Sequence, residues 1–120
     1  MEDQKRINSA EAFNIAQTFP IEPMFNKVIV TLNKEEVDHY LVLSDNIMSE
    51  EQYVVAFGQH VHNIALGDKV LLDIEKMMSK EINPENQDEY ITRIKIDPIT
   101  VDGNMYALIE DRFIKAKYKN

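Results

Sequence analysis

Short apolar runs separated by polar stretches recur along most of the chain and predict a protein built mainly from β-strands. β-Branched and aromatic residues, which suit the pleated surface of a sheet, concentrate in these stretches. The predicted strands are residues 27–32, 38–43, 53–57, 69–75, 90–96, 104–109 and 113–118. Short strands in this number, with little helix between them, are typical of an all-β fold, a small barrel or a sandwich.

The first 20 residues follow a different pattern. Apolar residues recur there at three-residue spacing, which predicts a short helix: Ala10, Phe13 and Ala16. Ser9 is a candidate for its N-cap, and Pro20 ends it. We therefore divide the chain into an N-terminal arm, helical or extended, over residues 1–20 and a β domain over residues 21–120. The arm also carries large apolar residues that predict a contact surface for a partner or a neighbouring subunit: Phe13, Ile15 and Phe19.

Composition narrows the class of protein. A chain of 120 residues is long enough for one domain with a modest core. It has no cysteine, so neither a disulfide framework nor thiolate chemistry is expected. A net charge of −8 argues against binding to nucleic acid, which needs clustered Lys and Arg. No apolar run reaches the length of a membrane helix and the first residues are polar, so we expect a cytoplasmic protein.

Residues that could support catalysis or metal binding are few. His60 and His62 stand two apart, so on a strand they would share a face and could share a metal ion. No third ligand is evident at strand spacing, and two histidines in a turn are more often solvated. Carboxylates occur mainly as adjacent pairs in predicted turns, and neighbours on a strand point to opposite faces. With three glycines the chain has no Gly-rich phosphate loop. We expect no enzymatic activity, no metal site and no cofactor.

Four segments, taken in order, carry a recognisable pattern. Residues 21–30 place a proline ahead of a β-branched strand, residues 54–58 end a strand on glycine, and residues 66–72 contain Leu-Gly-Asp-x-Val. Residues 105–116 form a hydrophobic strand, an acidic turn and a short strand. This series resembles the co-chaperonin (GroES) family. The resemblance lies in the order of the motifs more than in any one of them.

The resemblance implies a fold and a function. The expected fold is a small GroES-like, partly open β-barrel. The expected assembly is a homo-oligomeric ring, a heptamer, that caps the chamber of a GroEL-like chaperonin ring and assists protein folding. In the family the partner-binding residues lie in a mobile loop between the first two matching strands. The residues at that position here are Leu41, Val42 and Leu43.

The same tripeptide has a second reading, in which it forms a buried strand of the core. Short apolar runs do not distinguish a strand from an anchor by pattern alone. The family usually has a Gly-Gly pair before the tripeptide, and this chain has His39 and Tyr40. Loss of both glycines stiffens the backbone and favours an ordered segment.

The resemblance also implies a contact between subunits, because the family's last strand pairs with the first strand of the next subunit. We expect both ends to be open edges. The residues of this interface are Val28, Ile29, Val30, Phe113, Ile114 and Ala116.

The chain departs from the family in two places. Residues 59–66 leave only a short or missing roof, and residues 74–104 take a longer path whose polar part, residues 77–89, is predicted to be a loop. Short roofs and altered loops occur in bacteriophage members, which would place the protein in the host cytoplasm. The alternative is a structural or virion assembly protein that keeps a GroES-like fold without chaperone activity.

Overall fold

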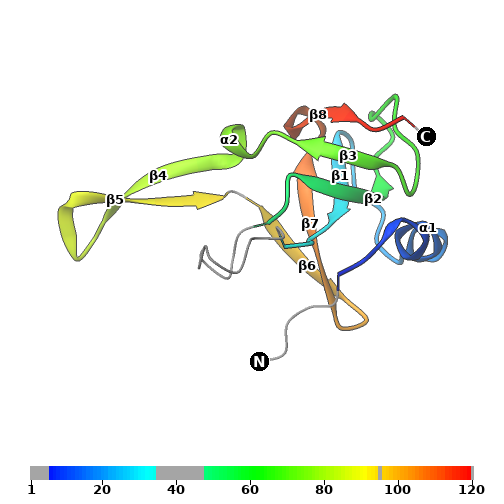
Figure 1. Ribbon diagram of the computed structural model, residues 1–120, viewed down its shortest axis with the longest axis horizontal. Helices are drawn as coiled ribbons and strands as arrows, with labels where there is room; N and C mark the ends of the chain where they lie inside the picture. The colour runs from blue at the N-terminus through cyan, green and yellow to red at the C-terminus, as the bar shows by residue number, and fades with distance from the viewer. Residues whose placement is uncertain (1–5, 35–47, 95, 120) are drawn as a thin grey trace.

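The computed structural model describes residues 6–34, 48–94 and 96–119, and these form a mainly β structure (Figure 1). The predicted β-rich class is confirmed. The helices are α1 (Ser9–Gln17), the single-turn α2 (Ile74–Met77) and the 3-10 turn η1 (Asp111–Phe113). The strands are β1 (Lys27–Thr31), β2 (Glu51–Phe57), β3 (Lys69–Leu72), β4 (Met78–Asn83), β5 (Asn86–Ile94), β6 (Asp97–Val101), β7 (Asn104–Glu110) and β8 (Ile114–Lys117).

Six of the strands form one antiparallel sheet in the order β6-β7-β1-β2-β3-β8. β1 lies in its middle, between β2 and β7, and β6 and β8 are the outer strands. The strands predicted over residues 27–32, 53–57 and 104–109 are confirmed as β1, β2 and β7 within two residues at each end. The strand predicted over residues 38–43 lies outside the described residues.

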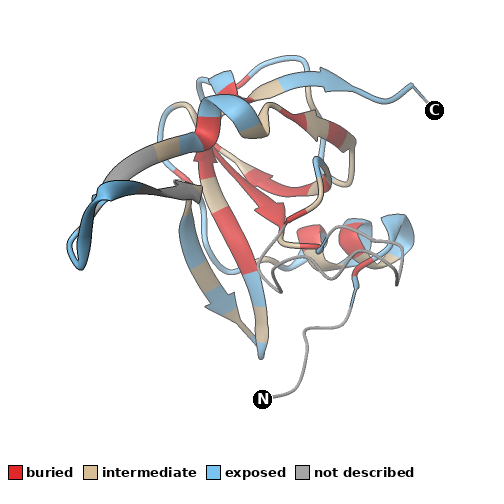
Figure 2. Cartoon of the chain, turned by 60° about the vertical axis from the view of Figure 1, so that its left-hand side comes forward, coloured by how far each residue is buried: buried red, intermediate tan, exposed pale blue. Residues whose placement is uncertain are grey.

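The sheet is buried on both faces, and Figure 2 shows the buried residues concentrated in its central strands. Val28 and Val30 belong to the main core, whereas Ile29, between them, belongs to a second cluster beneath α1. This division follows from the alternation of side chains along a strand. β1 therefore reads as an uninterrupted apolar run because each of its faces meets a core.

The arm begins with a well-capped helix. The Asn8 side chain accepts a hydrogen bond from the Glu11 amide at 2.9 Å, and the Glu11 carboxylate accepts one from the Asn8 amide. This reciprocal pair is a capping box. The helix is confirmed, but its N-cap is Asn8 and not Ser9, because Asn8 stands three residues before a Glu that can complete the box.

The arm packs on the sheet. Ala12 and Ala16 of α1 are buried in the second cluster, together with Ile7. Phe19 meets Tyr106 of β7 edge to face, with ring centroids 5.0 Å apart. Of the three apolar residues predicted to form a contact surface, Phe13 is 53% exposed, while Ile15 and Phe19 pack against the second cluster. Most of the arm's apolar surface is therefore part of the core.

The chain after β3 differs most from expectation. The strand predicted over residues 69–75 ends at Leu72, because the Asp73 side chain accepts from the Lys76 amide and caps α2. The polar loop predicted over residues 77–89 is wrong, since this stretch forms β4, a turn and the start of β5. The β4–β5 hairpin stands away from the sheet (Figure 1). Residues 90–94 of β5 belong to the strand predicted over residues 90–96, whereas the rest of this ribbon lies outside the core and is too polar for the pattern to indicate it.

The last part of the sheet begins with β6. Asp97 and Pro98 are residues typical of a turn, but they open this strand. Proline lacks an N–H and is tolerated here because β6 is an outer strand. Asp102 and Gly103, with φ of 50° and 82°, form the turn into β7 that their residue types predict. Positive φ at both central residues is typical of a type I′ hairpin.

Candidate functional site

The predicted partner-binding residues Leu41, Val42 and Leu43 lie outside the described residues. The structure does describe the two ends of the chain around them. Lys34 and Met48 form an isolated antiparallel bridge. Beside them, the Ser49 amide donates to the Asn33 carbonyl at 2.9 Å. The described residues on either side of the 35–47 segment, Lys34 and Met48, are therefore neighbours.

A buried glutamine joins these two ends. The Oε1 atom of Gln52 accepts from the Thr31 hydroxyl and from the Asn33 amide, both at 2.8 Å. Its Nε2 atom donates to the Asn33 carbonyl at 2.8 Å and to the Ser49 carbonyl at 2.9 Å. Gln52 is fully buried, and these four bonds use its whole hydrogen-bonding capacity.

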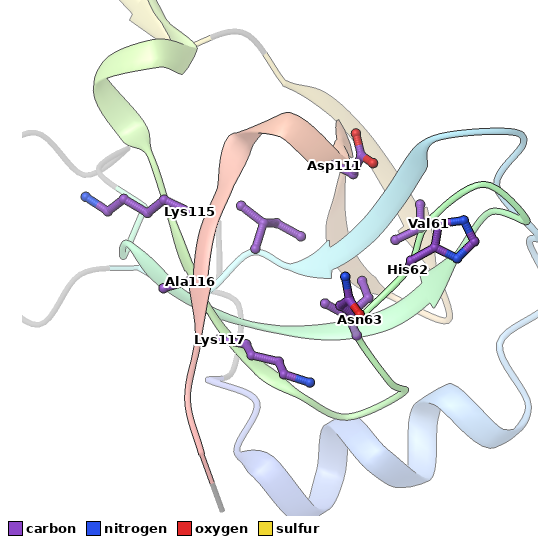
Figure 3. Close-up of a pocket in the computed structure, with 9 residues that line it drawn as sticks. Val61, His62, Asn63, Asp111, Lys115, Ala116 and Lys117 are labelled. Atoms are coloured by element: carbon purple, nitrogen blue, oxygen red, sulfur yellow. The ribbon is translucent and has the colours of Figure 1, made fainter.

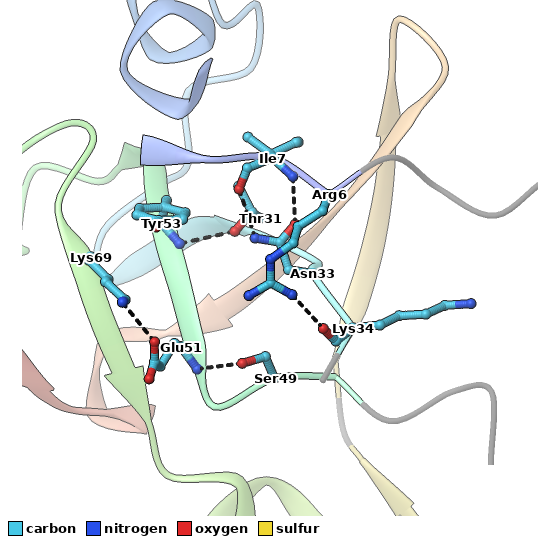
Figure 4. A network of polar contacts seen from close by, with 9 residues as sticks. All are labelled: Arg6, Ile7, Thr31, Asn33, Lys34, Ser49, Glu51, Tyr53 and Lys69. Atoms are coloured by element: carbon cyan, nitrogen blue, oxygen red, sulfur yellow. Dashed lines mark hydrogen bonds and ion pairs between the residues drawn. The ribbon is translucent and has the colours of Figure 1, made fainter. Parts of the chain in front are cut away.

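A buried asparagine extends the network to the arm. The Asn33 side chain donates from Nδ2 to the Ile7 carbonyl at 3.0 Å and accepts at Oδ1 from the Ile7 amide at 2.9 Å (Figure 4). Arg6 adds an exposed bond from Nη1 to the Lys34 carbonyl at 2.9 Å. We call this set the base cluster, and it consists of the buried residues Ile7, Thr31, Asn33 and Gln52 and the half-buried Ser49.

Sequence reasoning missed the base cluster, although one signal was present. Gln52 stands two residues before Val54, on the inward-facing side of the same strand. A polar residue at an inward position of a strand needs hydrogen-bond partners, because burying it without them is costly. Its place directly before the apolar run of residues 53–57 therefore marks Gln52 as a residue that must bond to another part of the chain.

A second candidate lies along the outer strand β8. A shallow pocket of about 260 Å³ separates β8 from the β2–β3 connection (Figure 3). Its lining combines aliphatic groups with basic side chains: Val61, His62, Asn63, Ile64, Asp111, Ile114, Lys115, Ala116 and Lys117. β8 pairs with β3 along one edge, and no other described strand pairs with its second edge.

The predicted interface residues fall into two groups. Val28, Ile29 and Val30 are fully buried, and both edges of β1 are occupied by β2 and β7. The expectation that these three residues form an open edge is therefore wrong, since apolar runs of this kind are also typical of central strands. The other three residues lie at the outer side of the sheet: Phe113 in η1 is buried, Ile114 is half-buried and Ala116 is exposed.

An ion pair and a cation–π contact link β2, β3 and the residue that follows β8. Lys69 of β3 lies 2.8 Å from the Glu51 carboxylate and 4.6 Å from the centre of the Tyr118 ring. The pKa of Glu51 is lowered, first by its hydrogen bond with Lys69 and then by its hydrogen bond with Tyr118. The hydrogen bond between Glu51 and Lys69 also raises the pKa of Lys69. Desolvation, followed by the bond with Glu51, raises the pKa of Tyr118. All three groups are solvent-accessible, so salt screens their attraction.

The histidines do not form a metal centre in the described structure. His60 and His62 are exposed in the β2–β3 connection, and Val61 between them is buried in the main core. The described part of the chain has no group of three or more His, Cys, Asp or Glu side chains that could hold a metal ion. Two of the paired carboxylates serve as ion-pair partners, Glu51 for Lys69 and Glu110 for Lys27 and Arg112.

Within the described ranges, no helix is long and apolar enough to cross a membrane. Comparison with models of protein families gives no match, and comparison with curated proteins gives none either. The resemblance to co-chaperonins therefore rests on the motifs of the sequence and stays a prediction.

Proposed function

We propose that the protein is a non-enzymatic, co-chaperonin-like ring subunit that caps a chaperonin chamber. The observation that carries this proposal is where the matching segments lie. Three of them contribute to β1, β2 and β3, which are consecutive neighbours in the sheet. The fourth supplies β7, the acidic turn η1 and the outer strand β8. Segments that match in order along the chain are thus joined in one sheet.

The proposed fold is a GroES-like, partly open barrel. Support comes from the main core, in which residues of β1, β2, β3 and β7 meet Phe113 of η1 in one cluster. Strands at different places in the sheet order bury side chains together when the sheet curls around them. The outer strands β6 and β8 are the edges that such a barrel leaves open.

The proposed ring contact uses the outer edge of β8. An edge strand with an adjacent groove accepts an extended segment of another chain, whose backbone pairs with the edge. Since both edges of β1 are occupied, we assign the neighbour's contribution to the segment before β1. Three apolar residues there are more than a third exposed: Ile21, Met24 and Phe25.

The assembly is tested by placing a charge on the outer strand. Ala116→Asp introduces a carboxylate at an exposed position of β8, so it should dissociate the ring while each subunit stays folded. Native mass spectrometry measures the particle and thermal scanning measures the fold. Ala10→Asp adds the same charge to an exposed position of α1 and serves as the control. A wild-type protein that is monomeric at all concentrations contradicts the ring.

The lid function is tested with Leu43→Ser. Several weak loop contacts act together on one ring, so a loss of about 1 kcal/mol in each loop multiplies into loss of binding. Co-sedimentation with a chaperonin and ATP should fail for the variant ring, while its melting temperature stays near that of the wild type. If binding persists and the melting temperature falls sharply, Leu43 belongs to the core.

One observation favours the alternative, a structural or virion assembly protein. The β4–β5 hairpin projects from the sheet and exposes Met78 and Ile82, at 44% and 62%. An isolated two-stranded hairpin is marginal in water, and exposed apolar groups on it suit a contact with another subunit. A stable assembly that binds no chaperonin under any nucleotide condition would favour this alternative.

A further inference from the structure

We infer that Asn33 and Gln52 are positioning residues, which couple the N-terminal arm to the two ends of the 35–47 segment. This inference rests on the proposed function, which places the chaperonin contact in that segment. It concerns described residues alone: the arm at Ile7 and the two ends at residues 33–34 and 48–49.

Both side chains act as a strand partner would. In a sheet, one residue donates its N–H and accepts at its C=O from the same neighbour. Here the Gln52 amide bonds both backbone groups of Asn33, and the Asn33 amide bonds both backbone groups of Ile7. The two amides therefore form a relay of two steps, from β2 to the end of β1 and from there to the arm.

The relay begins where the backbone ladder stops. Pairing between β1 and β2 is recorded as far as Val30 with Val54, after an irregularity between Ile29 and Val30. Beyond it, the Thr31 hydroxyl accepts from the Tyr53 amide at 3.0 Å and donates to Gln52. Side chains thus replace the ladder beyond Val30, so they fix the backbone at Asn33 and Ser49, close to the two ends of the 35–47 segment.

Burial makes the relay rigid. Asn33 is 2% exposed, Gln52 is fully buried and Ile7 is 3% exposed. In such surroundings a satisfied network is strong, whereas a broken one leaves polar groups without partners. The two ends of the segment and the arm are consequently expected to open together, because Gln52 bonds backbone groups of Asn33 and Ser49 while Asn33 in turn bonds those of Ile7.

The consequence for binding is pre-organisation. A loop whose ends are fixed loses less conformational freedom when its partner binds than a loop with free ends. Coupling is reciprocal, so binding at the segment should in turn protect the arm at Ile7. The arm then contributes to partner binding without touching the partner.

The relay is tested by hydrogen exchange on the protein alone. Gln52→Met keeps the approximate size of the side chain and removes all four bonds. Since Gln52 lies two steps from Ile7, faster exchange of the Ile7 amide, by about tenfold or more, would support the relay. Gln59→Met alters an exposed glutamine and should leave this amide unchanged. Unchanged exchange at Ile7 in Gln52→Met would overturn the relay.

A second variant guards against a Gln52→Met protein that does not fold. Asn33→Ala removes only the bonds to Ile7, so the Ile7 amide should exchange faster, and the Ser49 amide, still bonded to the Asn33 carbonyl, should exchange faster with it because the arm and the two ends open together. Unchanged exchange at Ser49 in this variant overturns the relay as well.

The positioning role is tested by chaperonin binding. Asn33→Ala should weaken co-sedimentation of the ring, measured at a temperature where it is fully folded. The control is Ile109→Ala, a core truncation at the opposite end of β1, where Ile109 pairs with Val28. Equal binding by the two variants overturns the positioning role. If the wild-type ring does not bind, the proposed function fails, while the exchange result still decides the relay.

Discussion

Replacement of Ala12 by aspartate tests whether the N-terminal helix is part of the fold. Ala12 is fully buried, and it belongs to the same cluster as Val55 and Ala56 of β2. An aspartate at this position would place a carboxylate between α1 and the sheet. Either the helix must leave the sheet or the charge must stay buried.

The size of the destabilisation follows from the complete burial of Ala12. A buried charge without a partner costs about 3–5 kcal/mol, and the added volume costs about 1–3 kcal/mol more. The free energy of unfolding of a domain is about 5–15 kcal/mol in total, so this substitution would leave little stability. Since each kcal/mol is worth about 4 °C for a chain of this length, the melting temperature should fall by at least about 10 °C.

The effect should also depend on pH. Burial raises the pKa of the new carboxyl in the folded state above its unfolded value. The penalty is therefore full at neutral pH and shrinks as the pH falls through that raised pKa, where the group becomes neutral. Thermal unfolding followed by circular dichroism, at about pH 7 and about pH 4, measures both parts of the prediction.

The control is Asn14→Asp, which introduces the same carboxylate on an exposed position of the same helix. It should melt within about 2 °C of the wild type, as surface substitutions usually do. If Ala12→Asp also melts like the wild type, the helix does not dock on the sheet. Residues 1–20 would then be a separate arm, as the sequence alone predicts.

Three further predictions concern Gly58, Gly103 and Glu51. A Cβ on Gly58 would lie 2.3 Å from the Phe25 carbonyl oxygen, so Gly58→Ala should cost about 1–3 kcal/mol in urea unfolding, by forcing the backbone apart. Gly103→Ala, which meets nothing within 4 Å but has φ of 82°, should cost about 1–2 kcal/mol through backbone strain alone, and a larger loss there than at Gly58 would contradict this account. The pKa of Glu51 is lowered by Lys69, so its carboxyl should titrate below the ordinary value in NMR and return towards it in Lys69→Met. Any stability from this pair is present above the unfolded pKa of Glu51 and is lost as the pH falls through its folded pKa. A pKa of Glu51 that stays as low in Lys69→Met as in the wild type would rule out Lys69 as the cause.

Much of the sheet could be predicted, because its central strands are rich in the β-branched, aliphatic and aromatic residues that suit a pleated surface. β2 and β7 are strands of this kind, and Asp102 with Gly103 marks the turn before β7. β4 and the first part of β5 could not be predicted in the same way, since a ribbon outside the core need not be apolar, whereas the last part of β5 lies within the strand predicted over residues 90–96. α2 depends on the Asp73 cap, which replaced the last residues of a predicted strand.

The candidate sites could be predicted less well, because they depend on pairing between distant segments. The apolar run of β1 did not indicate that β7 occupies its second edge. Asn33 is bonded to Ile7, which lies 26 residues earlier and carries no polar side chain to suggest it. Gln52 alone was marked by the sequence, because it directly precedes a run of apolar residues in a strand.

The β4–β5 hairpin has a practical consequence. Its strands pair with each other over six registered positions, and β4 follows α2 and contacts it. Residue pairs can therefore be removed from or added to its tip without changing any register in the six-stranded sheet. The tip at Pro84 and Glu85 is exposed, so a fluorophore or a fused peptide inserted there should leave the core of the protein intact. The length of the hairpin and the stability of the six-stranded sheet can therefore be engineered separately.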